Sequence, residues 1–173
     1  MKKWACPLIN WTLVPTHSAG SFNQFPAFHT GLPMGNHPGA FGVVRKNHTH
    51  EGVDLYAPPC TKVCAVEEGI VVHIEPFTGE HANTPWWENT WAVFVEGDSG
   101  VVVYGEIALS PHIVLGCKLQ RKALIGEVIP VLKKDKGRPG CMLHLELHEK
   151  GTREAPAWEA KRPSTLKDPT PYF

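Results

Sequence analysis

The chain lacks three features that would place it quickly in a class of protein. Its 17 Lys and Arg balance its 17 Asp and Glu, so no basic surplus is available for neutralising phosphates. No apolar run reaches the roughly 18 residues that a membrane helix needs. The five cysteines are odd in number and contain no CxxC pair, which argues against a complete disulfide framework and a cysteine zinc cluster. We therefore expect reduced thiols, no nucleic-acid partner and no membrane insertion.

The first residues of the sequence do not have the pattern of a secretory signal peptide. Met1-Lys2-Lys3 carries the charge of a signal-peptide start, but Cys6, Pro7, Asn10 and Pro15 interrupt any apolar run. We expect no signal peptide in these residues.

Length and composition predict one β-rich domain. A chain of 173 residues has room for a single domain with a tail. Hydrophobic residues make up 42% and charged residues 20%, which is typical of a folded globule rather than a disordered chain. Gly and Pro together supply 32 of the 173 residues, and this high share favours turns over long helices.

The chain divides into three parts. Residues 1–40 form a Pro-rich N-terminal arm without helical or alternating periodicity, and residues 151–173 form a polar, Pro-broken tail that we expect to pack on the domain. Residues 41–150 are the predicted β domain, because they contain short β-branched runs punctuated by glycine. The runs predicted as strands are 63–66, 70–74, 91–95, 101–104, 124–128 and 142–147. Residues 96–100, Glu-Gly-Asp-Ser-Gly, tolerate positive φ and predict an antiparallel hairpin between two of them.

The first candidate site is the segment His50-Glu51-Gly52-Val53-Asp54. In an extended chain, residues four apart point to the same face, so His50 and Asp54 offer an imidazole and a carboxylate to one metal ion. Such a pair is also common by chance. A surface hydrogen bond between the two side chains is the alternative.

The second candidate site is the segment 142–148, where apolar and polar residues alternate strictly. Alternation puts Met142, His144, Glu146 and His148 on one face and three leucines on the other. We expect the leucine face to be buried and the histidine face to line an accessible groove beside the strand carrying Asp54. Two neutral histidines and one carboxylate leave a zinc ion with an open position, as in catalytic zinc sites.

In order along the chain, these blocks resemble the lysostaphin and LytM-type zinc metallopeptidases, which cut cross-links in bacterial cell-wall peptidoglycan. The family's HxGxDL block matches residues 50–55, its Tyr-x-His-Leu hairpin end matches residues 104–107, and its His-x-His-Phe-Glu block matches residues 142–146. The resemblance covers about residues 40–150. It implies an all-β fold with an antiparallel sheet core, zinc as the cofactor, and action on the cell envelope or outside the cell.

Carried over residue by residue, the resemblance assigns the zinc ligands to His50, Asp54 and His144. Glu106 and Met142 stand where the family has two further histidines, which marks a variant subgroup lacking both. Met142 has neither a proton to give nor useful basicity. Glu106 is either the catalytic base that replaces a missing histidine or a carboxylate in a decayed site, where it can act as a fourth ligand.

Two functions therefore stay open at this point. One is a zinc endopeptidase that hydrolyses peptide bonds in peptidoglycan or a related peptide, and the other is an inactive, zinc-stabilised module that binds peptidoglycan or a protein partner through the same groove. We assign substrate binding to Tyr104, Trp86 and Trp87, and the two tryptophans either form a groove wall or pack under a loop. The arm of residues 1–40 is a further candidate for covering the groove. We expect a monomer.

Overall fold

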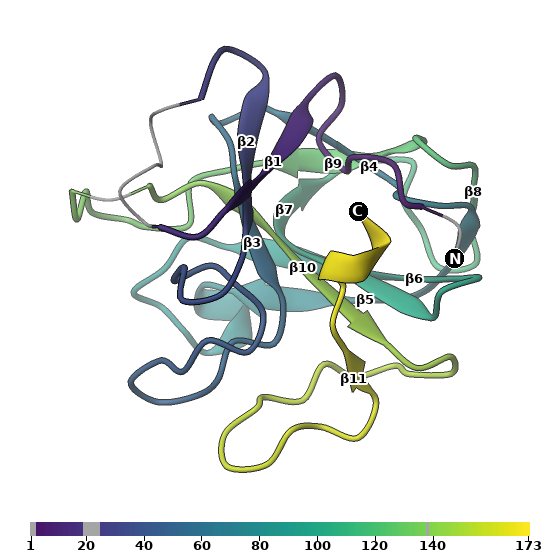
Figure 1. Ribbon diagram of the computed structural model, residues 1–173. Helices are drawn as coiled ribbons and strands as arrows, with labels where there is room; N and C mark the ends of the chain where they lie inside the picture. The colour runs from purple at the N-terminus through teal and green to yellow at the C-terminus, as the bar shows by residue number, and fades with distance from the viewer. Residues whose placement is uncertain (1–2, 19–24, 138) are drawn as a thin grey trace.

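The computed structural model describes residues 3–18, 25–137 and 139–173; Met1, Lys2 and residues 19–24 of the predicted arm lie outside this range. The regular secondary structure of the described residues is almost entirely β-strand, as predicted (Figure 1). Its strands are β1 (Thr12–Thr16), β2 (His29–Pro33), β3 (Val53–Tyr56), β4 (Lys62–Cys64), β5 (Gly69–Thr78), β6 (Thr90–Gly97), β7 (Val101–Leu109), β8 (Lys118–Leu119), β9 (Leu124–Val128), β10 (Met142–His148) and β11 (Leu166–Lys167). Two short 3-10 turns, η2 (Glu80–Ala82) and η3 (Thr170–Tyr172), complete the fold. None of the helical turns in the described ranges is long and apolar enough to cross a membrane.

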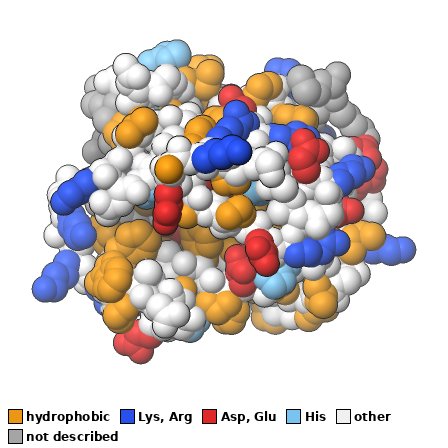
Figure 2. All heavy atoms as spheres, turned by 90° about the horizontal axis from the view of Figure 1, so that it is seen from below, with side chains coloured by type: hydrophobic (Ala, Val, Ile, Leu, Met, Phe, Trp, Pro, Cys, Tyr) orange, Lys and Arg blue, Asp and Glu red, His pale blue; other side chains and the backbone are white. Residues whose placement is uncertain are grey.

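One nine-stranded sheet forms the body of the protein. Its main path runs β11-β10-β7-β6-β5-β8, while β3 pairs with β10 and β9 bridges β4 and β7. Every pairing in this sheet is antiparallel. The hairpin predicted around residues 96–100 is confirmed, because β6 and β7 pair from Glu96↔Val101 onward. Figure 2 shows basic and acidic side chains interspersed on one face, in keeping with the balanced charge of the chain.

Strand β10 is paired with neighbouring strands along both of its edges. Along one edge it pairs with β3 and then β11, and along the other it pairs with β7. The side chains of Leu143, Leu145 and Leu147 are all fully buried in the main core. This confirms the predicted register, since the opposite set of side chains must then share the other face.

Truncating this leucine face is expected to destabilise the fold. Replacing Leu145 by alanine leaves a cavity between Val53 and Tyr104, its register partners on β3 and β7. Leucine-to-alanine changes in cores cost about 2–5 kcal/mol of unfolding free energy, measurable by urea titration. Leu115 is 68% exposed, so Leu115→Ala is the control, with an expected change within about 0.5 kcal/mol. Equal effects of the two substitutions would contradict the assignment of the core face.

The N-terminal arm contains structure that its sequence did not predict. Strands β1 and β2 pair in parallel as a separate two-stranded sheet. The arm has no alternating pattern because only one of the five side chains of β1 is buried. A hydrogen bond from the Thr30 hydroxyl to the Tyr56 carbonyl oxygen, 2.5 Å long, joins β2 to β3. The arm therefore lies against the strand that carries Asp54.

The C-terminal tail closes the sheet edge without a long helix. Strand β11 pairs with the end of β10, and the tail meets the N-terminal arm where Trp4 donates its backbone N–H to Tyr172 O at 2.7 Å (Figure 1). The rings of Trp4 and Tyr172 stack with centroids 4.9 Å apart. The boundaries at residues 40 and 150 stay predictions.

Candidate metal centre

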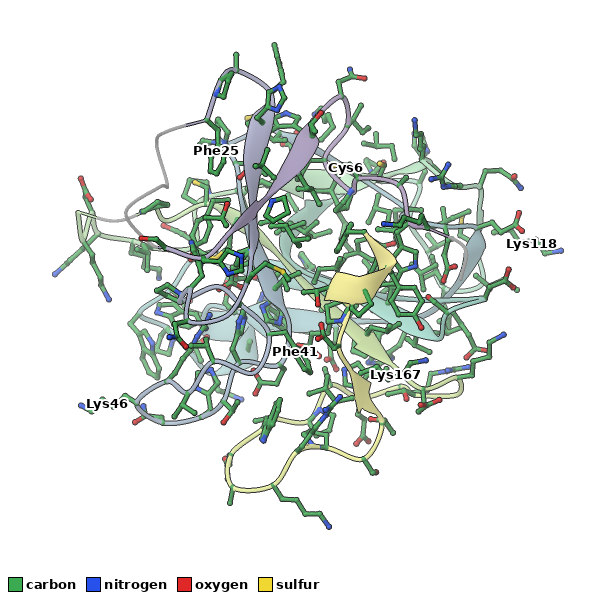
Figure 3. The ribbon with its side chains drawn as sticks, viewed as in Figure 1. Cys6, Phe25, Phe41, Lys46, Lys118 and Lys167 are labelled. Carbon is green, nitrogen blue, oxygen red and sulfur yellow. The ribbon has the colours of Figure 1, made fainter. Side chains whose placement is uncertain are left out.

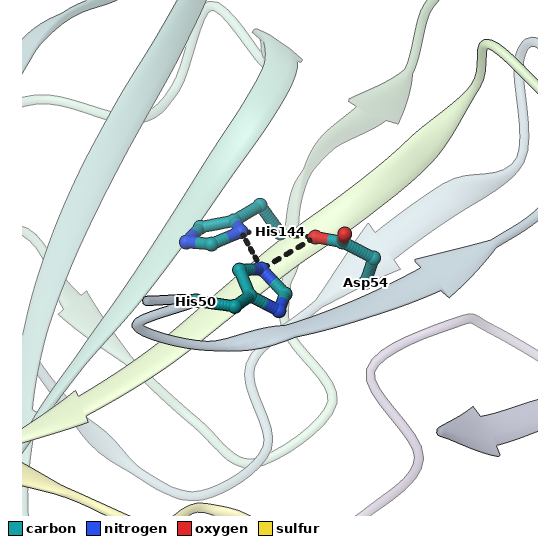
Figure 4. Close-up of side chains that lie close together, drawn as sticks. All are labelled: His50, Asp54 and His144. Atoms are coloured by element: carbon teal, nitrogen blue, oxygen red, sulfur yellow. Dashed lines mark hydrogen bonds and ion pairs between the residues drawn. The ribbon is translucent and has the colours of Figure 1, made fainter. Parts of the chain in front are cut away.

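Three side chains from two distant parts of the chain converge on one point (Figure 4). His50 Nε2 lies 3.0 Å from Asp54 Oδ1 and 3.2 Å from His144 Nδ1. His144 Nδ1 lies 3.0 Å from the same Asp54 oxygen. The predicted group of His50, Asp54 and His144 is thus assembled by the fold, with all three side chains buried.

Strand pairing explains how residues 90 positions apart meet. Asp54 on β3 is the register partner of His144 on β10, and side chains of such directly opposed residues are neighbours. His50 lies in the loop before β3, where its backbone N–H donates to Val43 O at 2.9 Å. Gly52 lets this segment lie against β10, because a Cβ at residue 52 would come within 2.4 Å of the Leu145 carbonyl oxygen.

Gly52→Ala is therefore expected to disturb the centre through the backbone alone. The contact with Leu145 O involves main-chain atoms that cannot rotate away, so β3 must shift relative to β10. We expect zinc affinity to fall together with thermal stability, measured by chelator competition and by calorimetry. Unchanged zinc affinity in a folded Gly52→Ala variant would show that this close approach does not set the ligand positions.

Each of the three converging side chains also has a hydrogen bond at its outer atom, the one that points away from the other two side chains. His50 Nδ1–H donates to Ala40 O at 2.9 Å, and His144 Nε2–H donates to Glu146 Oε1 at 2.8 Å. Arg45 donates to Asp54 Oδ2 at 2.6 Å. Hydrogen bonds of this kind on the outer atoms fix the tautomer and orientation of metal-ligating histidines.

The arrangement fits a divalent cation. With the outer imidazole nitrogens acting as donors, the three inner atoms present lone pairs to one another, and this is favourable only with a proton or cation between them. Burial lowers the pKa of His144, but hydrogen bonds to Asp54 and Glu146 outweigh it and hold that pKa well above its usual range. Ligands of a tetrahedral zinc ion are roughly 3.3–3.4 Å apart, close to the separations of 3.0–3.2 Å found here.

Glu106 sits at a β-bulge beside this group. Between the pairs Val93↔Tyr104 and Trp91↔Ile107, strand β7 has two residues where β6 has one. Glu106 has a φ of 63°, in the left-handed region that non-glycine residues seldom adopt. Such bulges redirect side chains and are frequent next to active sites.

The bulge buries the Glu106 carboxyl near the candidate ligands. Burial, followed by the negative charge of Asp54, raises the pKa of Glu106 to about 7, while the charges of His144 and Arg45 act in the opposite direction. Among the described residues, none gives Glu106 Oε2 a hydrogen bond, although this atom is buried. A buried carboxyl with a free oxygen and a pKa near neutrality is suited to accept or give a proton.

The prediction that the histidine face of β10 is accessible was wrong. His144 is 6% exposed, Glu146 3% and His148 0%. The alternation showed which side chains share a face but not what covers it. The Phe77 ring lies 5.5 Å from the ring of His144, and Thr165 of the tail bonds to His148. Glu146 and His148 therefore lie behind His144 rather than lining a groove.

The residues predicted to bind substrate differ in how far they are buried. Tyr104 is 1% exposed and its hydroxyl accepts a hydrogen bond from Val66 N at 2.9 Å, so this side chain belongs to the core and its assignment was wrong. Trp86 is 62% exposed, and the backbone of Trp87 bridges to Leu132. Their role as a groove wall stays a prediction. Met142 is half-buried and opposes Tyr56 at the end of β3.

A cavity of about 660 Å³ opens at this end of β3 and β10. Tyr56 and Cys141, at the strand ends, line it together with the arm residues Trp11, Phe25 and Phe28. Figure 3 labels Phe25 beside the β1–β2 pair. The cavity is thus formed between the arm and the domain, and most of the residues that line it are aromatic or apolar.

Two supporting residues were not predicted. Arg45 precedes the His50 motif and gives no signal of its own, because a lone arginine in a polar loop is usually solvated. Its guanidinium bonds to both Asp54 and Pro38 O. Ala40 acts through its carbonyl oxygen, which no side-chain pattern reveals.

Comparison with solved structures supports the fold. The catalytic domain of the antimicrobial peptidase lysostaphin from Staphylococcus simulans aligns with a TM-score of 0.51 and 19% identity, over 91% of this chain and 98% of that one. The SpoIIQ–SpoIIIAH pore-forming complex gives a TM-score of 0.56 and 17% identity over 100% and 92%. A candidate M23 peptidase from Pseudomonas aeruginosa gives a TM-score of 0.41 and 20% identity, over 64% of this chain but only 42% of its own length. Neither protein-family models nor curated proteins give a match. The chain has the fold of the lysostaphin-type peptidases.

Proposed function

We propose that the protein is a zinc-dependent endopeptidase acting on peptide bonds of cell-wall peptidoglycan or a related peptide. The observation that carries this proposal is the convergence of His50, Asp54 and His144 at 3.0–3.2 Å, with both histidines bonded on their outer nitrogens. Two imidazoles and one carboxylate leave a zinc ion an open coordination position. Zinc bound there supplies a Lewis acid that polarises the scissile carbonyl and promotes attack by water.

The residues of the chain have separate roles in this reaction. Glu106 takes the proton from the attacking water and passes it to the leaving amine, for which its raised pKa is suited. Arg45 and Glu146 hold Asp54 and His144 in position. The cavity between the arm and the strand ends holds a part of the peptide away from the scissile bond, against Tyr56 and the aromatic residues of the arm, because neither Glu106 nor a candidate ligand lines it.

The alternative is a zinc-stabilised binding module without hydrolytic activity. The burial of all three candidate ligands favours it, since the centre has little surface open to a substrate. Met142 also supplies no donor for the developing oxyanion. Such a module uses the same cavity to bind peptidoglycan or a protein partner.

Incubation of the zinc-loaded protein with purified peptidoglycan separates the two functions. New amino termini that disappear after chelation and return with zinc are the result expected of the endopeptidase. Sedimentation with peptidoglycan in the absence of any new amino termini would instead identify the binding module. Glycine-rich peptides serve as a second substrate class in the same assay, read by mass spectrometry.

A further inference from the structure

The C-terminal tail is hydrogen-bonded to the loop that carries His50. The backbone N–H of Thr49 donates to Trp158 O at 2.7 Å, and the backbone N–H of Trp158 donates to Glu51 Oε1 at 2.7 Å. The two bonds lie on either side of His50 in the sequence. A residue more than 100 positions away thereby fixes the backbone around one candidate ligand.

Side chains reinforce this contact. The rings of Phe41 and Trp158 lie 5.7 Å apart, and Figure 3 labels Phe41 in this region. The Arg162 guanidinium lies 5.2 Å from the Phe41 centroid and 5.6 Å from that of Trp158, within the range of cation–π attraction. Arg162 also donates to Leu166 O at 2.8 Å, next to Thr165.

The same tail ends a chain of buried hydrogen bonds that starts at His144. Glu146 Oε1 bonds to His144 Nε2 at 2.8 Å, and Glu146 Oε2 bonds to His148 Nε2 at 2.7 Å. His148 Nδ1 then bonds to Thr165 Oγ1 at 3.0 Å. Both carboxylate oxygens of Glu146 are therefore occupied by imidazoles, one of which belongs to a candidate ligand.

The direction of these bonds determines which atom of His144 faces the metal. Each carboxylate oxygen of Glu146 faces one imidazole nitrogen, and a carboxylate accepts, so Glu146 accepts at both oxygens. His148 donates through Nε2–H and accepts the Thr165 hydroxyl proton at Nδ1. His144 donates through Nε2–H and keeps Nδ1 for the metal.

We propose that His148 is a positioning residue of the metal centre, which holds Glu146 against His144 and is itself anchored by Thr165 of the tail. The proposal rests on the zinc binding proposed above. It extends the centre to a fully buried residue four positions beyond His144, whose link to that candidate ligand runs through the Glu146 carboxylate. Outer partners of zinc-binding histidines typically contribute about 10- to 100-fold to metal affinity.

Three substitutions test the proposal in the full chain, with zinc affinity measured by chelator competition. His148→Phe removes the donor to Glu146, and we expect it to weaken zinc binding at least about 10-fold. His148→Gln places an amide N–H where Nε2 was, and we expect it to restore most of that loss. Thr165→Val removes only the hydroxyl that bonds to His148, at the end of the hydrogen-bond chain far from the metal. We expect it to weaken zinc binding less than His148→Phe does.

A purely structural role predicts a different pattern. If His148 has only a structural role, His148→Phe lowers the melting temperatures of the zinc-loaded and metal-free proteins equally. If it has a positioning role, the substitution also reduces the increase in melting temperature that zinc binding produces. His73 pairs with Glu75 at 3.1 Å on β5, so His73→Phe is the matched control and should leave zinc affinity unchanged.

Zinc affinity equal to that of the unmodified protein in His148→Phe would overturn the proposal. If His148→Phe does not fold, equal affinities of Thr165→Val and the unmodified protein would overturn it instead. Absence of zinc binding by the unmodified protein would refute the proposed metal centre itself, which distinguishes the two failures.

Discussion

Glu106→Gln is expected to keep its zinc and its fold while losing about 100- to 10,000-fold in the rate of peptide cleavage. Glutamine has nearly the same shape and fits the buried position at the bulge. It cannot take a proton from water, because an amide has no useful basicity. Cleavage is measured by mass spectrometry of peptidoglycan fragments, and zinc content by elemental analysis of the same samples.

Two comparisons make this result specific. Glu75 is partly exposed on β5, where it pairs with His73, so Glu75→Gln should not alter cleavage. Glu106→His combined with Met142→His replaces the carboxylate base by an imidazole and adds at residue 142 the donor that the present site lacks, and we expect it to raise the rate. If the unmodified protein cleaves and Glu106→Gln cleaves equally fast, Glu106 is not the base, although the fold and the metal centre survive.

His144→Ala is expected to abolish stoichiometric zinc binding. This ring supplies one of three converging atoms and is also bonded to both Asp54 and Glu146. Its removal leaves two buried carboxyl groups without their shared partner, an arrangement that is costly in a protein interior. Elemental analysis after dialysis reports the zinc content, and circular dichroism verifies that the variant remains folded.

His73→Ala provides the control for this loss, because it removes another histidine that is paired with a carboxylate. Its zinc content should match that of the unmodified protein. Asp54→Asn keeps the size of the side chain but removes its charge, and we expect a smaller loss than in His144→Ala. Full zinc retention by a folded His144→Ala variant would show that this histidine is not a ligand.

Periodicity predicted the parts of the fold that depend on burial of a single face. The alternation in 142–148 located a strand, its buried leucines and the common side of His144, Glu146 and His148. The first prediction succeeds because side chains of a strand alternate regardless of what packs on them. The His50–Asp54 spacing predicted a shared direction, and the two side chains do meet, but only Asp54 lies on β3, while His50 lies in the loop before this strand.

Features that depend on distant contacts were not predictable in this way. The covering of the histidine face comes from Phe77 and from the tail at Thr165, neither of which is near β10 in sequence. The left-handed backbone of Glu106 is also hidden, since the positive φ falls on Glu106 and not on Gly105, the neighbouring residue of the bulge. Tyr104 matches a family motif, yet its position on the core side of β7 makes it a structural residue.

The coordination sphere in a zinc-loaded crystal structure tests the account most directly. We predict one zinc ion held by His50 Nε2, Asp54 Oδ1 and His144 Nδ1 at distances of about 2.0–2.2 Å, with its fourth position free of protein ligands and facing Glu106. Zinc at another place, or the Glu106 carboxylate as a fourth protein ligand that closes the site, would contradict it.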